Sequence, residues 1–143
     1  MRATVARIAS VDDTITEAVL AANAEFYRAF EAQELDAMSE LWMHDERAVC
    51  THPGWPTLRG WASVSASWFA LFTESSPLQF ILTDVAVHRH GDIAWVTLDE
   101  NLIAEEVGGT VAALNLFVLD DDRWRMIAHH GGAVHRRSPL DPS

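Results

Sequence analysis

A histidine and an asparagine, each set in an apolar run, are the residues best suited to chemistry in this sequence. His52 ends the run AVCTH and stands directly before Pro53, which biases the preceding residue toward an extended backbone. A neutral imidazole has a reference pKa of about 6.5, so His52 could remove a proton beside a carbonyl at neutral pH. The alternative is a histidine at a loop end that bonds to a nearby backbone group.

Asn115 is the one polar residue of the run VAALNLFVL. A buried amide without a partner costs about 1–3 kcal/mol, so the pattern predicts a partner, either a ligand or a neighbouring side chain. As a neutral donor, the amide could hydrogen-bond a developing enolate oxygen. We therefore predict that Asn115 lines a pocket and acts together with His52 in catalysis.

Tryptophans near these positions could form the wall of an apolar pocket. Of the six tryptophans in the chain, Trp55 and Trp68 flank the loop after His52 and are the candidates for the cavity. Trp42 and Trp61 are predicted to pack in the core instead.

Two further histidines, His129 and His130, are consecutive in a predicted strand, so their side chains point to opposite faces and only one can line a pocket. The pattern leaves open which of the two does so. His130 shares its parity with Trp124 and Met126, and we take His130 as the pocket candidate.

Metal and cofactor chemistry has no matching motif. His88 and His90 share a strand face, but they stand beside a turn without an obvious third ligand, and no spacing matches a zinc motif. The sequence also has no phosphate-binding glycine loop and no nucleophile elbow. We predict neither a metal site nor a cofactor.

The composition is that of an acidic globular chain. Its 143 residues suit one domain, which we place at residues 11–135 with flexible ends at 1–10 and 136–143. A net charge of −11 argues against a nucleic acid or an anionic membrane as a partner. The chain has no apolar run long enough to span a membrane and no signal-peptide core, and its single cysteine is Cys50, so we predict a cytoplasmic protein.

Helices are predicted to precede strands along the chain. Thr14 and Glu17 have the spacing of a capping box, and the apolar stripe that follows predicts a helix to about Gln33. The further elements are helices over residues 35–42 and 61–72, and strands over 48–52, 79–89, 92–104, 110–120 and 123–134. This order predicts an α+β fold, with a curved antiparallel sheet wrapped around three N-terminal helices.

The strand TVAALNLFVL carries apolar residues at both parities, so both of its faces should be shielded from water. Helices can cover one face of the sheet, and a second subunit is the simplest cover for the other. We therefore predict a symmetric homodimer packed sheet to sheet.

Four segments in this order form a recognisable pattern: FEAQELDAMSELW, AVCTHPGWPTLRGWASVSASW, VHRHGDIAWVTLDEN and ALNLFVLDDDRWRMIAHH. Over roughly residues 14–134 the chain resembles the SnoaL-like and ketosteroid-isomerase-like proteins of the nuclear-transport-factor-2-like superfamily. The resemblance implies a cone with a deep central pocket, often in a dimer. Pockets of this family serve isomerases, cyclases, dehydratases and hydrolases, and also proteins without catalysis, so fold alone does not select a function.

The resemblance also implies roles for particular residues. His52 stands where ketosteroid isomerases have the general-base aspartate before a proline, and Asn115 stands where they have an oxyanion-binding aspartic acid. Their oxyanion tyrosine aligns with Phe26, which has no hydroxyl, and we expect the adjacent Tyr27 to point elsewhere. Steroid isomerase activity itself is therefore not expected. The ligand pocket would be shaped by Phe26, Trp55, Trp68, Phe117 and His130.

These observations predict a protein that binds a small apolar molecule. The reaction, if there is one, would be a cofactor-independent isomerisation, cyclisation or dehydration through an enolate. The alternative is a ligand-binding or dimerisation module of the same fold without catalysis. An epoxide-hydrolase-like reaction would need a paired Asp–Arg–Asp set, for which only Asp99, Glu100 and Arg125 are candidates.

Overall fold

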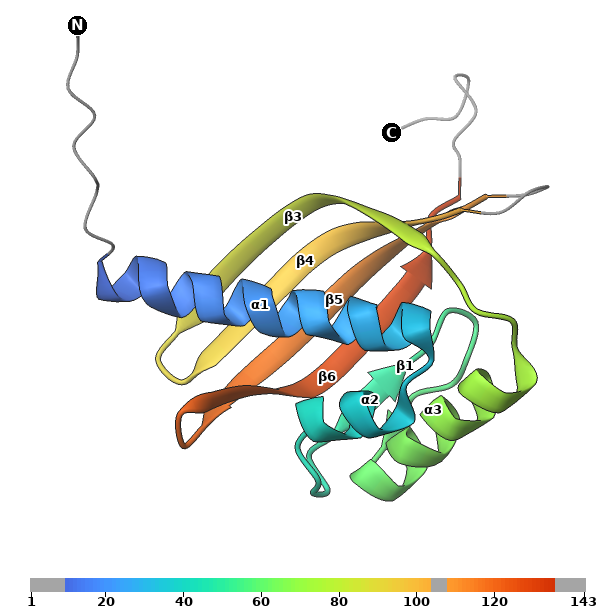
Figure 1. The fold of residues 1–143 in the computed structure, drawn as a ribbon, viewed down its shortest axis with the longest axis horizontal. Helices are drawn as coiled ribbons and strands as arrows, with labels where there is room; N and C mark the ends of the chain where they lie inside the picture. Colours follow the sequence, from blue (N-terminus) through green and yellow to red (C-terminus); the bar gives the residue numbers. More distant parts are fainter. Residues whose placement is uncertain (1–9, 104–107, 136–143) are drawn as a thin grey trace, which may run out of the picture.

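The computed structural model describes residues 10–103 and 108–135, and it confirms the predicted α+β fold. The three helices are α1 (Val11–Ala32), α2 (Leu35–Leu41) and α3 (Trp61–Glu74). The strands are β1 (Val49–Thr51), β2 (Leu58–Arg59), β3 (Phe80–His90), β4 (Ile93–Leu102), β5 (Thr110–Asp120) and β6 (Arg123–Ala133). Helix α1 crosses the face of the four long strands, while α2 and α3 lie at the end of the sheet that carries β1 (Figure 1).

Helix α1 begins one turn earlier than the sequence predicted. Ser10 is the N-cap: its hydroxyl accepts from the backbone N–H of Asp13 at 3.1 Å, and the Asp13 side chain accepts in return from the Ser10 backbone. This pair has the same spacing as Thr14 and Glu17, so the predicted capping box was wrong in position. Most of the two predicted flexible ends lies outside the described residues, but Ser10 belongs to the helix cap.

The buried stripe of α1 carries two polar residues. Asn23 and Tyr27, one helical turn apart, are buried on it with Val19, Phe26 and Ala29. Helix α1 therefore presents polar groups, as well as apolar ones, to the sheet.

The sheet is mixed rather than wholly antiparallel. Its strand order is β2-β1-β6-β5-β4-β3, and the four long strands form the predicted antiparallel meander. Strand β1, however, runs parallel to β6, with Cys50 opposite His129. Because the last strand of the meander lies beside a strand from the first half of the chain, the His52 segment is brought next to the two consecutive histidines.

A one-residue bulge at Ile127 interrupts the pairing of β5 with β6. Before the bulge, Trp124 and Met126 are buried under the helices; after it, His129 and Gly131 are buried instead. An extra residue in one strand shifts the alternation of side chains to the opposite face. The bulge therefore decides which of the two histidines enters the core.

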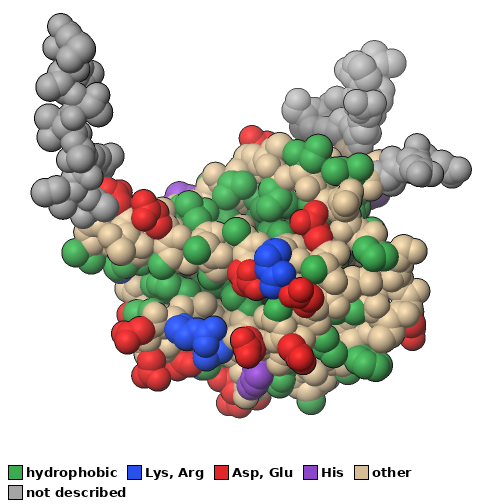
Figure 2. Space-filling model, in the orientation of Figure 1, with side chains coloured by type: hydrophobic (Ala, Val, Ile, Leu, Met, Phe, Trp, Pro, Cys, Tyr) green, Lys and Arg blue, Asp and Glu red, His purple; other side chains and the backbone are tan. Residues whose placement is uncertain are grey.

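Aromatic and aliphatic side chains fill the space between helices and sheet. Trp42 packs in this core as predicted, with 1% of its surface exposed, whereas the half-buried Trp61 stacks on the His44 ring at 4.4 Å. Acidic side chains are spread over the surface that carries the helices (Figure 2). None of the helices in the described part of the chain combines the length and the apolar character needed to cross a membrane.

The close approach of β6 to the loop after β1 gives a stability prediction. A Cβ atom at Gly131 would lie 3.0 Å from Val111 Cγ1 and 3.2 Å from Pro53 Cγ, whereas a Cβ at Gly132 meets no atom within 4 Å. Gly131→Ala should lower the free energy of unfolding by about 1–3 kcal/mol through overpacking. Gly132→Ala, measured by the same urea titration, should have little effect. Equal losses in the two variants would contradict this account.

Candidate functional site

A tight turn holds His52 at the end of β1. Trp55 donates its backbone N–H to the His52 carbonyl at 2.8 Å, and Gly54 has a positive φ of 82°. Proline followed by glycine with positive φ is typical of a type II β-turn, in which a side chain at the glycine position would be strained. The HPGW sequence thus fixes the backbone on both sides of the imidazole.

Beside this turn lies a partly enclosed cavity of about 140 Å³. Helices α1 and α3 and the HPGW turn form its walls. Most of its lining is apolar, and the full set is Phe30, Gln33, His52, Pro53, Trp55, Leu71, Phe72, Ser75, Ser76 and Leu78. Two predicted site residues, His52 and Trp55, therefore line one cavity. His52 is buried, while Trp55 is 38% exposed.

The hydrogen bonds of His52 define its tautomer. Its Nε2 lies 2.9 Å from Ser67 Oγ, and the Ser67 hydroxyl donates its single hydrogen to the Val64 carbonyl at 2.6 Å. Ser67 therefore accepts from an N–H at Nε2, which leaves Nδ1 of the neutral ring unprotonated. Burial lowers the pKa of His52 from 6.5 to about 4, so the imidazole is neutral at pH 7.

Cys50 lies next to this histidine but is not an activated nucleophile. Its Sγ is 3.6 Å from His52 Nε2, and burial raises the pKa of the thiol to about 12. A thiol that stays protonated is a poor nucleophile and a poor metal ligand. Among residues 10–103 and 108–135, no group of three or more histidine, cysteine or acidic side chains could hold a metal ion.

Asn115 lies at the centre of a buried polar cluster formed by Asn23, Tyr27, Glu100, Asn115 and His129. Its Nδ2 donates to Asn23 Oδ1 at 2.9 Å and to the Tyr27 hydroxyl oxygen at 3.1 Å. Its Oδ1 accepts from His129 Nδ1 at 2.5 Å. The predicted partner of Asn115 is thus a set of side chains. Both N–H groups of the Asn115 amide thus donate to α1 side chains, and its oxygen accepts from a β6 side chain.

The cluster ends in a buried carboxyl group. The Tyr27 hydroxyl donates to Glu100 Oε2 at 2.5 Å, and Glu100 is 3% exposed. Burial raises the pKa of Glu100 to about 7, although the Tyr27 hydrogen bond opposes this change. Burial and the neighbouring carboxylate also raise the pKa of the Tyr27 hydroxyl. Near neutral pH, Glu100 therefore exchanges between a carboxylic acid and a carboxylate inside the core.

His129 is the histidine that enters this interior, whereas His130, the predicted pocket residue, does not. His130 is exposed on the opposite face of β6, because the bulge at Ile127 reverses the parity on which that choice rested. His129 donates from Nδ1 to Asn115, and burial lowers its pKa to about 3, with smaller effects from the two other histidines near it. It is a neutral ring at pH 7.

An aromatic layer formed by Trp68 and Phe26 lies between the cavity and the polar cluster. Both side chains are fully buried and neither lines the cavity, and the same holds for Phe117. The Trp68 ring centre lies 4.8 Å from that of His52 and 6.1 Å from that of His129. The ring centres of His52 and His129 are 6.4 Å apart, but His52 lines the cavity and Asn115 does not, so the structure does not bring His52 and Asn115 together at one open cavity.

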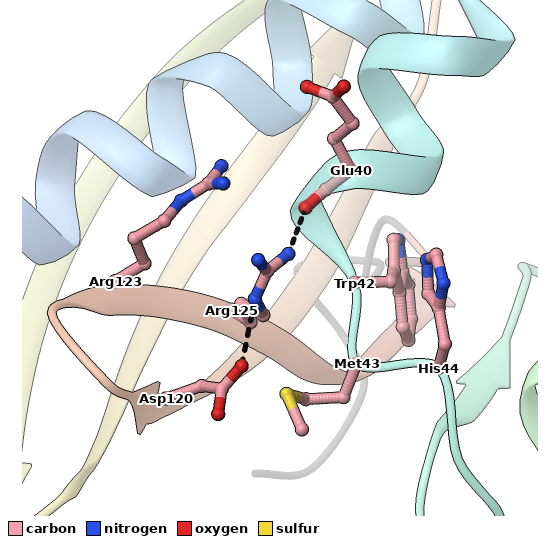
Figure 3. A pocket seen from close by; sticks show the side chains of 7 residues that line it. All are labelled: Glu40, Trp42, Met43, His44, Asp120, Arg123 and Arg125. Atoms are coloured by element: carbon pink, nitrogen blue, oxygen red, sulfur yellow. Dashed lines mark hydrogen bonds and ion pairs between the residues drawn. The ribbon is translucent and has the colours of Figure 1, made fainter.

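The three candidates for an epoxide-hydrolase-like set also do not converge. Glu100 faces the core, whereas Asp99, its neighbour in β4, faces the other side of the sheet. Arg125 is engaged elsewhere, with its Nε 3.1 Å from Asp120 Oδ2 and its Nη1 donating to the Glu40 carbonyl (Figure 3).

Arg125 belongs to a second, more open hollow of about 380 Å³ between α2 and the β5–β6 turn. Figure 3 shows Trp42, Met43 and His44 on one side of it and Arg123 on the other. Its central guanidinium, that of Arg125, is paired with Asp120, and the lining also carries the charged residues Glu40 and Arg123, so this hollow is polar. It has fewer apolar residues to contact an apolar molecule than the His52 cavity has.

Two members of the polar cluster, Asn23 and Tyr27, were missed as site residues. Glu100 was considered only for the epoxide-hydrolase-like set, and His129 only as the alternative to His130. The expectation that Tyr27 points elsewhere was wrong, because Tyr27 lies on the buried stripe of α1 and contacts both Asn115 and Glu100. The sequence did carry a signal for the two residues of α1. Asn23 and Tyr27 are one helical turn apart, so they lie on the same face of the helix.

In its curved six-stranded sheet with three helices, the chain is similar to solved structures of the NTF2-like and cystatin-like folds. Within this class the chain belongs to the SnoaL-like domain family, whose pattern matches residues 19–134.

Three relatives illustrate the range of this family. A protein from Streptomyces avermitilis named a "putative dehydratase" of the NTF2-like family is 35% identical, with a TM-score of 0.82 over 88% of this chain and 100% of that one. A "putative calcium/calmodulin-dependent protein kinase type II association domain" from Thiobacillus denitrificans is 33% identical, with a TM-score of 0.75 over 81% of this chain and 94% of that one. The F-box protein SKIP8 of Arabidopsis thaliana is 29% identical over 119 residues, which are 83% of this chain. The chain spans about half, 51%, of the length of that curated relative.

The buried titratable groups give opposite contributions to stability. The folded chain keeps the Glu100 proton that the unfolded chain loses above pH 4.5, so this contribution to stability disappears as the pH rises toward 7. His52 and His129, with pKa values lowered to about 4 and about 3, contribute stability above pH 6.5 that is lost as the pH falls through these values. Between pH 5 and 6.5 the two histidines outweigh the one carboxyl, and stability should rise with pH.

Glu100→Gln should therefore steepen this rise by about 1.4 kcal/mol per pH unit, because it removes the one opposing proton. Urea titrations at pH 5, 5.5, 6 and 6.5 measure the slope. Glu74→Gln removes the same charge from an exposed position on α3 and should leave the slope unchanged. The same slope in wild type and Glu100→Gln would contradict a raised pKa at Glu100.

Proposed function

We propose that this SnoaL-like protein binds a small, mainly apolar molecule in the cavity beside His52. The observation that carries the proposal is a neutral, rigidly held imidazole in the wall of a mainly apolar cavity. Pockets of this type bind apolar ligands through their aromatic walls and orient them through a few polar groups. Here Phe30, Phe72 and Trp55 supply the aromatic walls. The polar residues of the lining are His52, Gln33, Ser75 and Ser76.

The size of the cavity restricts the ligand. A dry apolar cavity of about 150 Å³ in another protein accepts one benzene molecule. The cavity here is about 140 Å³, so a single six-membered ring matches its volume. Ligands larger than this would extend past Trp55, the most exposed aromatic side chain of the lining.

The geometry supports binding more strongly than enolate chemistry. A pKa of about 4 keeps His52 in the proton-accepting form but makes it a weak base. Asn115, the second half of the predicted catalytic pair, has both amide donors committed to Asn23 and Tyr27. Asn115 is then a positioning residue that fixes the buried ring of His129.

If the protein is an enzyme, the reaction that we propose is a dehydration. The name of the relative from Streptomyces avermitilis supports this choice. In its first step a C–H bond beside a carbonyl breaks, the proton passes to His52, and the electron pair forms an enolate. In D₂O this step would exchange the carbon-bound proton of a cyclic ketone for deuterium, and His52→Gln would abolish the exchange. Exchange at the buffer rate would support binding without catalysis.

Ligand binding can be tested with a panel of cyclic ketones and small aromatic compounds. A molecule that binds only the folded state raises the melting temperature, and a concentration of 100 times its Kd stabilises the protein by about 2.7 kcal/mol. We expect a ketone of one ring to raise the melting temperature of wild type. The rise should be smaller in His52→Ala and unchanged in His90→Gln, which alters an exposed histidine at the β3–β4 turn. A panel without any stabilising compound would overturn the proposal.

A second candidate function is self-association through the outer face of the sheet, the face away from the helices. Five apolar residues alternate with the buried ones there and stay partly exposed: Trp95, Leu114, Leu116, Val118 and Ile127. The relative from Thiobacillus denitrificans is named an association domain. We propose a symmetric homodimer in which two copies of this face pack together.

Leu114→Glu should disrupt such a dimer, because it places a charge in the middle of the outer face, where Leu114 is 42% exposed. Sedimentation equilibrium should find a dimer for wild type and at least a tenfold weaker association for Leu114→Glu. Val11→Glu, at a 76% exposed position of α1, is the matched control and should remain dimeric. A monomeric wild type would overturn this second function.

A further inference from the structure

Two indole N–H groups are buried without a hydrogen-bond partner among the residues that the structure describes. They are Nε1 of Trp42 and Nε1 of Trp68, and at most 1% of either residue is exposed. A buried donor without an acceptor costs about 1–3 kcal/mol, and an indole N–H can only donate. A phenylalanine would avoid this cost, so each unpaired N–H calls for an explanation.

Trp68 lies against the cavity. Its ring centre is 4.8 Å from that of His52, 5.0 Å from that of Phe30 and 5.7 Å from that of Phe72, and all three of these residues line the cavity. Trp42 differs in this respect. Its recorded ring contacts are with Trp61 at 6.1 Å and with Trp68 at 6.5 Å, and neither partner lines the cavity.

None of the polar groups around Trp68 pairs with its indole N–H. His52 donates from Nε2 to Ser67, and Ser67 in turn donates to the Val64 carbonyl. His129 donates from Nδ1 to Asn115. The remaining unprotonated nitrogens of the two rings make no hydrogen bond to Trp68 Nε1, so the protein gives Trp68 a polar group in an apolar layer without giving it an acceptor.

We infer that Trp68 is a specificity-determining residue whose Nε1–H donates to an oxygen of the bound molecule. The ligand would be a single-ring compound with a carbonyl or ether oxygen, whose ring occupies the cavity and whose oxygen passes between His52 and Phe30. Side-chain adjustments of this size are common on ligand binding. The bond replaces the unfavourable buried donor with a satisfied one, so it selects an oxygen-bearing ring over a hydrocarbon of the same shape. This inference rests on the proposed ligand binding in the same cavity.

The test compares cyclohexanone with methylenecyclohexane, which replaces the carbonyl oxygen with a CH₂ group of similar shape. The dissociation constants are measured by NMR titration of ¹⁵N-labelled wild type, Trp68→Phe and Trp42→Phe, at concentrations below the solubility limit of the hydrocarbon. Each variant also assigns its indole resonance by the disappearance of that signal. Trp42→Phe is the matched control, because it removes the other buried and unpaired indole N–H.

We expect wild type to bind the ketone roughly fivefold more tightly than the hydrocarbon, the factor that one net hydrogen bond supplies. Trp68→Phe should lose this preference and Trp42→Phe should keep it. In wild type the ketone, but not the hydrocarbon, should move the Trp68 indole proton downfield. If Trp68→Phe fails to fold, the Trp68 indole signal is assigned in wild type from its NOE contacts to the rings of Phe26 and Phe30, so this readout still holds.

The outcomes separate the two levels of the proposal. If both compounds bind with equal affinity and the Trp68 indole proton responds equally to both, the cavity binds ligands and the role of Trp68 is wrong. The same conclusion follows if Trp68→Phe keeps the preference for the ketone. If neither compound perturbs the signals of His52 or Trp55, the cavity is not a binding site, and both the proposed function and this inference fail.

Discussion

One buried carboxamide, that of Asn115, ties the helix layer to the sheet. Through it, α1 is joined to β5 by the bonds to Asn23 and Tyr27, and β5 is joined to β6 by the bond to His129. Each partner is buried, so loss of the amide would leave several polar groups unsatisfied at once, and a network of this kind is worth more than its separate bonds. The position of α1 over the sheet, and with it the wall of the cavity, depends on this side chain.

Burial keeps this polar interior nearly free of charge. Both inner histidines stay neutral at pH 7, and Glu100 is partly protonated because its pKa is near 7. The chain carries a net charge of −11, yet its acidic side chains gather at the surface (Figure 2). At the cavity wall, His52 therefore presents a hydrogen-bonding group with a fixed direction and no net charge at pH 7.

The fold could be predicted because the spacing of hydrophobic residues along the chain shows which side chains are buried. This spacing differs between helices and strands. The same reasoning indicated that Asn115 had a buried partner. It did not reveal the partner, since Asn115 and Asn23 are far apart in the chain. Tyr27 was misjudged because α1 contacts β3 as well as β6, which widens its buried stripe beyond one row. The sequence could not show that His129 rather than His130 faces the interior. The bulge at Ile127 that shifts the alternation has no local sequence signature, because it arises from the pairing with β5.

The strand order has a consequence for synthesis on the ribosome. Strand β1 is joined only to β2 and β6, and β6 is the last strand to emerge. Until residues 123–133 leave the exit tunnel, the His52 segment has no long strand to pair with, and the central amide has no imidazole partner. The aromatic layer can therefore be fully covered only after β6 has emerged, which makes closure of the core a late step.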